Sequence, residues 1–193
     1  TALRLGQAPR AVFDVVPASD IYQLVAEAIA AARASGRGAI VCVPDGSSLA
    51  EWDRRFAEIL GPDNHVLLSS TQKPAVRYRS FVRVARGEVR VVVGTRGAAW
   101  APVQDLGLVV VVDDGNDLHA ELRAPYPHAR EVLLTRSIRE NAGVLLVGHA
   151  RSVEATSLVN LGWCQAIGPD LITRRRAWPQ VEVTDGSERG SAP

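Results

Sequence analysis

The sequence contains no methionine, a single lysine and only two cysteines. No apolar run approaches the ~20 residues that a membrane-spanning helix needs, and no segment resembles a signal peptide. Cys42 and Cys164 lack the spacing of a metal site, and Cys42 lies in an apolar run where a buried thiol is expected. These absences favour a cytoplasmic protein with reduced thiols and no membrane partner. Because no initiator residue is present, we expect the chain to be a piece of a longer protein.

A large excess of charge of either sign is also missing. The net charge is +1, and arginine supplies almost all of the positive charge. Such a balance neither favours nor excludes nucleic acid as a partner. Any surface that binds DNA must therefore be a local cluster of cations.

Strand-like and helix-like stretches alternate along the chain. The strands are apolar on both faces, as in a parallel sheet that helices cover on both sides. The pattern therefore predicts an α/β fold, a three-layer αβα domain over residues 11–167. We expect residues 1–10 to be a linker and residues 168–193 a polar tail, with a stray strand at 181–183. The predicted strands are 11–16, 39–43, 65–68, 89–93, 108–112 and 144–147, and the predicted helices are 20–34, 48–60, 74–86, 128–139 and 152–161.

The turn after the first predicted strand lacks the residues of a phosphate-binding loop. Such a loop needs glycines and a Gly-Lys-Ser/Thr end, whose amides and lysine hold phosphates. Residues 15–19 read Val-Val-Pro-Ala-Ser, with no glycine, and Pro17 removes an amide donor. Ser19 stands at the hydroxyl position, but a role as a helix N-cap explains it fully. We expect no ordinary ATP hydrolysis at this turn.

An acidic loop follows the predicted strand 108–112. Asp113, Asp114, Asp117 and His119 could hold magnesium or calcium, because hard cations prefer oxygen ligands. The spacing does not match a calcium-loop signature. We favour the alternative of a solvated acidic loop, and we assign no metal and no catalytic residue.

Two arginine-containing features could contact DNA. Thr95 and Arg96 lie between Gly94 and Gly97, in a turn that exposes amides, a hydroxyl and a guanidinium together, which suits a backbone phosphate. An ordinary strand-to-helix turn is an equal alternative. One predicted helix also carries a stripe of arginines that could follow a row of phosphates. Such a stripe more often forms the solvated face of an amphipathic helix. The stripe consists of Arg79, Arg83 and Arg86.

A third basic cluster lies near the end of the chain. Residues 174–176 are all arginine, and Trp178 follows. Proteins that bind single strands combine such charge with aromatic rings. At a polar terminus, disorder or a linker between domains is at least as common.

Taken in order, these segments resemble the first helicase lobe of the primosomal protein N′ (PriA) family of replication-restart helicases. Residues 86–96, Arg-Gly-Glu-Val-Arg-Val-Val-Val-Gly-Thr-Arg, are similar to the family stretch R-G-E-x-x-V-V-I-G-T-R-S-A. Residues 40–45 resemble its V-P-E segment, and Tyr126 with residues 128–130 resembles its Y-H-A-R. Gly148 and Ala150 keep two positions of its G-S-A-T-P motif. The resemblance covers about residues 20–163 and implies a RecA-like fold of the P-loop NTPase type.

The departures from the family pattern fall on the ATPase motifs. The family's G-S-G-K-T aligns with residues 15–19, so that its lysine becomes Ala18. Its D-E-E-H aligns with residues 112–115, so that Val112 replaces the magnesium-binding acid while Asp113 and Asp114 remain. Arg151 and Ser152 replace the threonine and proline of its third motif. This pattern resembles the degenerate PriA proteins of arginine-rich, high-GC bacteria, which are considered to lack helicase activity.

The resemblance implies a non-catalytic lobe that associates with forked or single-stranded DNA and with other primosome and replication proteins. Thr95 and Arg96 would contact the DNA backbone, because the corresponding family motif faces the strand. The family's zinc is expected only in parts of its chain that are missing here, and neither ATP nor magnesium is expected in this segment. Two alternatives stay open. One is an ATP-dependent 3′–5′ DNA helicase lobe with an atypical nucleotide site, and the other is a protein-interaction module.

Overall fold

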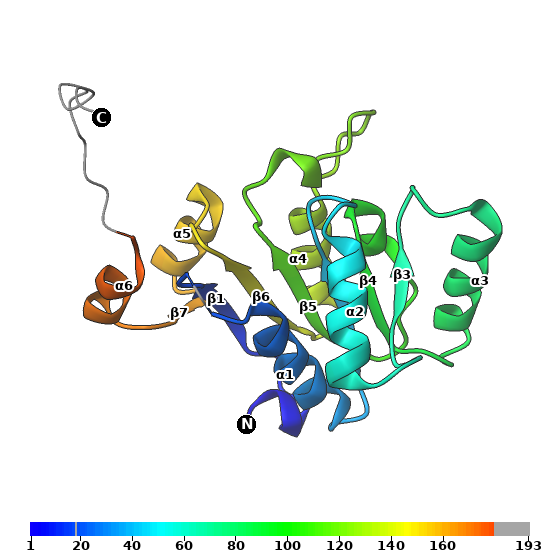
Figure 1. Cartoon of the computed structure of the whole chain (residues 1–193), viewed down its shortest axis with the longest axis horizontal. Coiled ribbons are helices and arrows are strands. Elements are labelled where there is room, and N and C mark those ends of the chain that lie inside the picture. The colour runs from blue at the N-terminus through cyan, green and yellow to red at the C-terminus, as the bar shows by residue number, and fades with distance from the viewer. Residues whose placement is uncertain (18, 180–193) are drawn as a thin grey trace, which may run out of the picture.

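The structure, a computed structural model, is built on one sheet of seven parallel strands (Figure 1). It describes residues 1–17 and 19–179, so Ala18 and the predicted strand at 181–183 lie outside the described residues. The strand order is β3-β4-β2-β5-β6-β1-β7. The strands are β1 (Arg10–Asp14), β2 (Gly38–Cys42), β3 (Val66–Leu68), β4 (Val91–Gly94), β5 (Leu106–Val112), β6 (Gly143–Gly148) and β7 (Gln165–Ile167).

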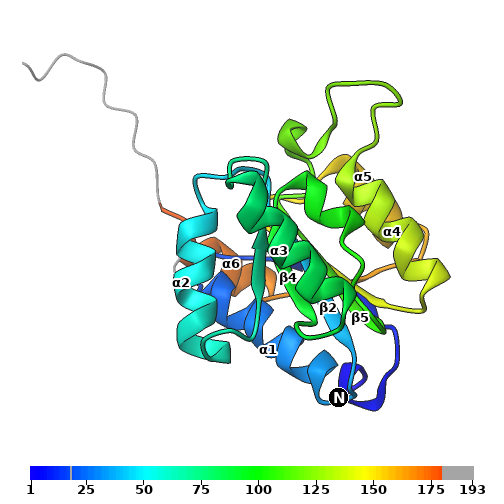
Figure 2. The same cartoon turned by 90° about the vertical axis from the view of Figure 1, so that its right-hand side faces the viewer.

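Helices cover both faces of this sheet, which confirms the predicted three-layer architecture (Figure 2). One face packs against α1 (Ile21–Arg33) and α2 (Leu49–Leu60). The other packs against α3 (Pro74–Ala85), α4 (Ala129–Arg139) and α5 (Val153–Asn160). Alternate residues of β1 to β6 enter opposite cores, because successive side chains of a strand point to opposite faces. None of the helices in the described part of the chain combines the length and the apolar character needed to cross a membrane.

The helix ends follow from local hydrogen bonds. The N-cap of α1 is Asp20 rather than Ser19, because the Asp20 carboxylate accepts a hydrogen bond of 3.0 Å from the amide of Gln23. Gly36, beyond the end of α1, has a φ of 78°, a conformation that glycine adopts without strain. Pro74 occupies the first turn of α3, where its missing amide hydrogen costs nothing.

One β-strand and one α-helix were not predicted from the sequence. The segment read as a polar tail contains α6 (Leu171–Ala177), and the sheet gains β7 at its edge. All three residues of β7 are exposed, so no apolar pattern marks the strand. The helix α6 buries no residue, and its start is held by a 2.7 Å bond from the amide of Thr173 to the carboxylate of Asp170.

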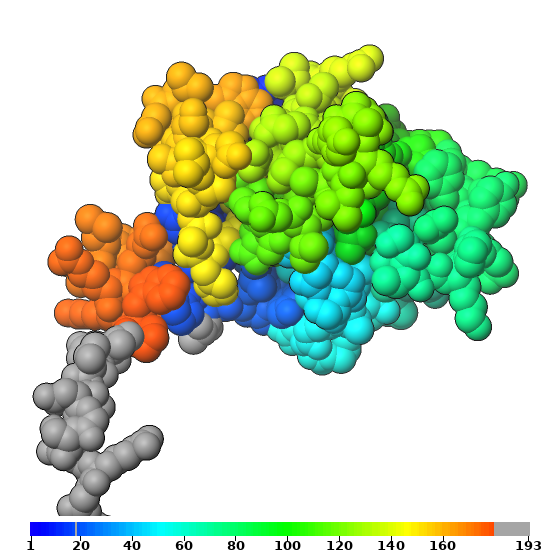
Figure 3. All heavy atoms as spheres, turned by 90° about the horizontal axis from the view of Figure 1, so that it is seen from above, coloured from blue at the N-terminus to red at the C-terminus, as the bar shows by residue number. Residues whose placement is uncertain are grey.

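The carboxyl ends of the parallel strands meet at one edge of the sheet. This edge gathers the turn after β1, the turn after β4, the acidic loop after β5 and the turn after β6. Short 3-10 helices continue two of these connections, η2 (Arg96–Trp100) after β4 and η3 (Asp117–His119) within the acidic loop, and another, η1 (Leu3–Leu5), precedes β1. Figure 3 shows the molecule from above, with α5 and α6 on the left and α3 on the right. Ligands of such sheets bind at this edge.

Gly94 closes β4 at a position where no side chain fits. A β-carbon there would overlap the carbonyl oxygen of Leu68 on β3 and would lie 2.8 Å from the β-carbon of Ala98. Gly97, three residues later in the same turn, has no atom within 4 Å of the corresponding position. Only one of these two glycines is therefore required by packing.

We expect Gly94→Ala to lower the free energy of unfolding by about 2 kcal/mol or more, the usual cost of overpacking a close-packed site. The matched control, Gly97→Ala, should change it by less than about 0.5 kcal/mol. Urea unfolding followed by circular dichroism measures both. Equal stability of the two variants would contradict this account of how the sheet positions the turn.

Candidate functional site

The turn after β1 uses its backbone amides within the protein. The amide of Val15 donates to the carbonyl of Gly148 at 2.9 Å, and the amide of Ser19 donates to the carbonyl of Val16 at 3.1 Å. Pro17 has no amide hydrogen. The ring of His149 donates from Nδ1 to the carbonyl of Val15 at 3.3 Å. The described part of this turn therefore does not present the row of free amides that a phosphate needs.

Two arginines neutralise the buried carboxylate at the end of β1. Asp14 is only 5% exposed. Its carboxylate accepts bonds from Arg151 Nη2 at 2.5 Å and Nε at 3.2 Å, and from Arg174 Nη1 at 3.0 Å. We call these three residues the Asp14 cluster. It joins β1, the turn after β6 and α6 beside the turn after β1, and it includes Arg151, one of the residues predicted to depart from the family pattern.

A second buried network holds the acidic loop. The carboxylate Oδ2 of Asp114 accepts a 2.5 Å bond from the hydroxyl of Ser152 and lies 3.4 Å from Nη1 of Arg130, which also donates to the Asp114 carbonyl at 2.9 Å. Arg130 is 4% exposed and pairs at 2.9 Å with Glu131 and with Glu154. A charge can stay buried only when it is paired and hydrogen-bonded in this way. Asp114 is therefore an anchor between the loop, α4 and α5.

His119 points into the core rather than toward the loop. Its Nε2 lies 2.8 Å from the carbonyl of Val112, which can only accept, so Nε2 carries the hydrogen and Nδ1 accepts from the thiol of Cys42 at 3.6 Å. Burial lowers the pKa of His119 and raises the pKa of the Cys42 thiol to about 12. Both groups are therefore neutral, and the predicted burial of Cys42 is confirmed.

The four acidic-loop residues that could have formed a metal site do not converge. Asp113 and Asp117 are exposed, whereas Asp114 and His119 are buried. Asp113 is exposed as a whole residue, but burial of part of its carboxyl group raises its pKa. Across residues 1–17 and 19–179, no group of three or more histidine, cysteine or acidic side chains is placed to hold a metal. The solvated-loop interpretation is correct for Asp117 but wrong for Asp114 and His119, because long-range partners bury them.

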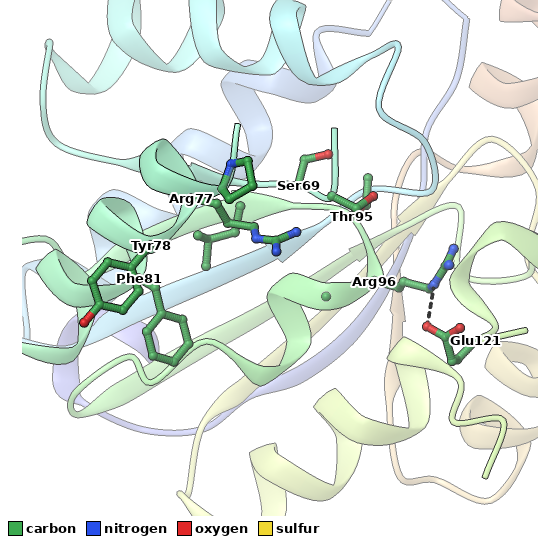
Figure 4. Close-up of a pocket in the computed structure, with 11 residues that line it drawn as sticks. Ser69, Arg77, Tyr78, Phe81, Thr95, Arg96 and Glu121 are labelled. Atoms are coloured by element: carbon green, nitrogen blue, oxygen red, sulfur yellow. Dashed lines mark hydrogen bonds and ion pairs between the residues drawn. The ribbon is translucent and has the colours of Figure 1, made fainter. Parts of the chain in front are cut away.

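A groove of about 570 Å³ lies between α3 and the turn after β4 (Figure 4). Thr95 and Arg96 line one side of this groove. The guanidinium of Arg96 donates from Nε to the carboxylate of Glu121 at 3.1 Å, and this hydrogen bond lowers the pKa of Glu121. The structure thus brings Thr95 and Arg96, the two residues predicted to contact the DNA backbone, to one open surface.

The opposite wall of the groove was not predicted from the sequence. It is formed by α3 through Arg77, Tyr78 and Phe81. The sequence carried a signal for this wall, because two aromatic residues alternate with arginines along the helix. The structure leaves both rings exposed, and the helix buries only Val84. We define Thr95, Arg96 and these three residues as the α3 groove.

The predicted arginine stripe lies on another side of α3. At 3.6 residues per turn, Arg79, Arg83 and Arg86 point about 160° away from the residues that line the groove. Arg83 and Arg86 lie 3.9 Å and 3.8 Å from the carboxylate of Glu88. The structure therefore does not bring the stripe together with Thr95 and Arg96. The basic cluster of residues 174–176 is not a single free surface either, because Arg174 pairs with Asp14.

Curated proteins are similar to this chain over nearly its whole length. It is 41% identical over 97% of its length to "Probable replication restart protein PriA" of Mycobacterium leprae, and 38% identical over 96% to the Mycobacterium tuberculosis (strain H37Rv) protein of the same name. It is 26% identical over 90% to "Replication restart protein PriA" of Bacillus subtilis. The chain belongs to the PriA family. It spans 29%, 28% and 21% of the length of these three relatives. No protein-family model matches it.

Solved structures show the fold of this PriA segment. It superposes on the helicase MrfA, solved with DNA and AMPPNP, with a TM-score of 0.57 and 16% identity, over 87% of this chain and 25% of that one. It superposes on RecG, solved with a three-way DNA junction, with a TM-score of 0.56 and 17% identity, over 83% and 20%. These likenesses confirm the RecA-like helicase fold.

The Asp14 cluster gives a test of how strongly the turn after β1 is held. We expect Asp14→Asn to lower the free energy of unfolding by about 2–3 kcal/mol, because the change leaves two arginines beside a neutral group. The estimate lies at the lower end for buried pairs because the side chains of Arg151 and Arg174 are 24% and 35% exposed.

The control is Asp117→Asn, which removes the same charge from an exposed position and should change stability by less than about 0.5 kcal/mol. Urea unfolding at neutral pH compares the two variants with the parent chain. If the midpoint of urea unfolding of Asp14→Asn equals that of the parent chain, the Asp14 cluster does not secure this turn.

Proposed function

We propose that the chain is a non-catalytic, DNA-associated lobe of a PriA-like replication restart protein. The observation that carries the proposal is that two residues of the degenerate third motif pair with buried acids at the other two motifs or beside them. Arg151 bonds Asp14, and Ser152 bonds Asp114. At the same edge of the sheet, the groove beside Thr95 remains open.

The residues present do not fit ATP and magnesium. Phosphoryl transfer depends on a lysine and backbone amides at the phosphates and on an acid at the metal. The chain has Ala18 and Val112 at the lysine and acid positions of the family, and the amides of Val15 and Ser19 already have partners. The carboxylate next to Asp113 in the sequence, that of Asp114, is not free, because it is buried against Arg130. These contacts argue against the atypical helicase alternative.

DNA is the partner that the remaining open surface suits best. Backbone phosphates bind hydroxyls and guanidinium groups, and Thr95 and Arg96 supply both at the rim of the α3 groove. Relatives of this chain are named for replication restart, and a protein with the same fold was solved on a three-way DNA junction. In this proposal the substrate is forked or single-stranded DNA, and the protein partners are other primosome and replication proteins.

A protein-interaction module is the second candidate function. Large apolar side chains lie exposed near the end of the described chain, which is unusual for a surface without a partner. They are Val153, Leu161, Leu171 and Ile172, which are 84%, 77%, 71% and 64% exposed. Binding of replication proteins without any binding of DNA would favour this candidate.

The test of the DNA contact is the affinity of the chain for forked DNA, measured by fluorescence anisotropy over a range of salt concentrations. We expect Arg96→Ala to weaken binding by about 10-fold, the effect of losing one charged hydrogen bond. The slope of the logarithm of the affinity against the logarithm of the salt concentration should become shallower by about one, as expected for the loss of one phosphate contact. Glu121→Gln should act in the opposite direction, because it releases Arg96 from its carboxylate partner.

The matched control is Arg139→Ala, which removes an exposed arginine at the end of α4, on the opposite edge of the sheet. It should leave the affinity and the salt dependence unchanged. The variant Arg79→Ala tests whether the arginine stripe on the other side of α3 also contacts DNA. Unchanged binding by Arg96→Ala would refute the contact at this turn.

A further inference from the structure

The aromatic wall of the α3 groove has no partner within the described chain. Tyr78 is 71% exposed and Phe81 is 43% exposed, on a helix whose only buried residue is Val84. Pro74 adds a further apolar surface at the start of the same helix. Two aromatic rings left in water on one wall of a groove offer flat faces to a ligand.

Positive charge lies beside these rings. Arg77 and Arg96 line the same groove, whereas the other arginines of α3 point away from it. In Figure 4, Arg77 lies between the aromatic pair and Thr95, and Arg96 lies on the far side of Thr95. Glu121, the acidic residue among those that line the groove, is paired with Arg96. The groove therefore combines an aromatic surface with cations a short distance away.

This combination matches a single strand of nucleic acid. Proteins that bind single strands stack bases on aromatic side chains while cations follow the backbone. In a duplex the faces of the bases are covered by their neighbours, so a stacking surface cannot reach them. The volume of about 570 Å³ also lies within the roughly 300–1,000 Å³ of pockets that enclose small ligands.

We propose that the α3 groove binds single-stranded DNA by stacking a base on Tyr78 and Phe81, with the adjoining phosphate held by Arg77 and the Thr95–Arg96 turn. The proposal rests on the proposed function, because it assumes that this lobe contacts DNA. It goes further in assigning a base-binding role to α3. The Thr95–Arg96 turn supplies the phosphate contact, and the aromatic pair distinguishes a single strand from a duplex.

The test compares two labelled oligomers of equal length by fluorescence anisotropy with the full chain at low salt. One is oligo-dT and the other carries abasic sites throughout, so that only the backbone remains. The parent chain should bind oligo-dT roughly 5-fold tighter or more, which is the effect expected from stacking one base. Tyr78→Leu should bring the two affinities together by weakening oligo-dT alone, whereas Tyr78→Phe should keep the preference.

These variants separate stacking from folding and from charge. Tyr78 is mostly exposed, so its replacement removes little packing, and circular dichroism checks that each variant folds. The matched control is Tyr126→Leu, at a ring that is 66% exposed outside the groove. It should keep the preference for oligo-dT. Binding to a duplex of the same length should not respond to Tyr78→Leu.

Each other outcome overturns a defined part of the account. Equal binding of both oligomers by the parent chain would refute stacking while leaving the phosphate contacts of the proposed function intact. Binding of neither oligomer would refute the proposed function itself. Loss of the preference in Tyr126→Leu but not in Tyr78→Leu would place the stacking ring outside the groove. Displacement of oligo-dT by polyglutamate, equally sensitive to Tyr78→Leu, would indicate an acidic polypeptide as the ligand.

Discussion

The carboxylate of Asp14 must be neutralised where it is buried, and much of the carboxyl edge of the sheet is arranged around that requirement. Arg151 and Arg174 supply the opposite charge from the turn after β6 and from α6. A buried carboxylate without partners would be far too costly to keep ionised. The pairing draws α6 onto the end of β1 and places two guanidinium groups beside the turn after that strand.

The requirement that a buried charge be paired also explains the structure of the acidic loop. In a motor ATPase, amides, cations and acids at this edge must stay available for phosphates and metal. Here Asp114 is bonded to Ser152 and Arg130, and the amides of Val15 and Ser19 are bonded within the backbone. Two residues that depart from the PriA pattern, Arg151 and Ser152, each contact an acid near a degenerate motif. Asp114, Ser152 and the amides of Val15 and Ser19 thus stabilise the fold, while the α3 groove stays open.

Local patterns in the sequence predicted most of the fold but only half of the candidate site. The strands were predictable because they are apolar on both faces, and the turn of Thr95 and Arg96 because glycines flank it. The buried state of Asp114 and the place of α6 depend on partners far away in the chain; Asp14 and Arg174, for example, are 160 positions apart. The aromatic wall of the groove was missed because Tyr78 and Phe81 resemble ordinary residues of an amphipathic helix.

The most direct test of the central claim is calorimetric titration of ATP and magnesium into the chain and into its Ala18→Lys variant, which restores the lysine of the family motif. The account predicts no saturable heat of binding for either protein, because the amides of Val15 and Ser19 and the carboxylate of Asp114 already have partners. Saturable binding by the parent chain that disappears in Asp113→Ala would contradict it and would indicate an atypical nucleotide site.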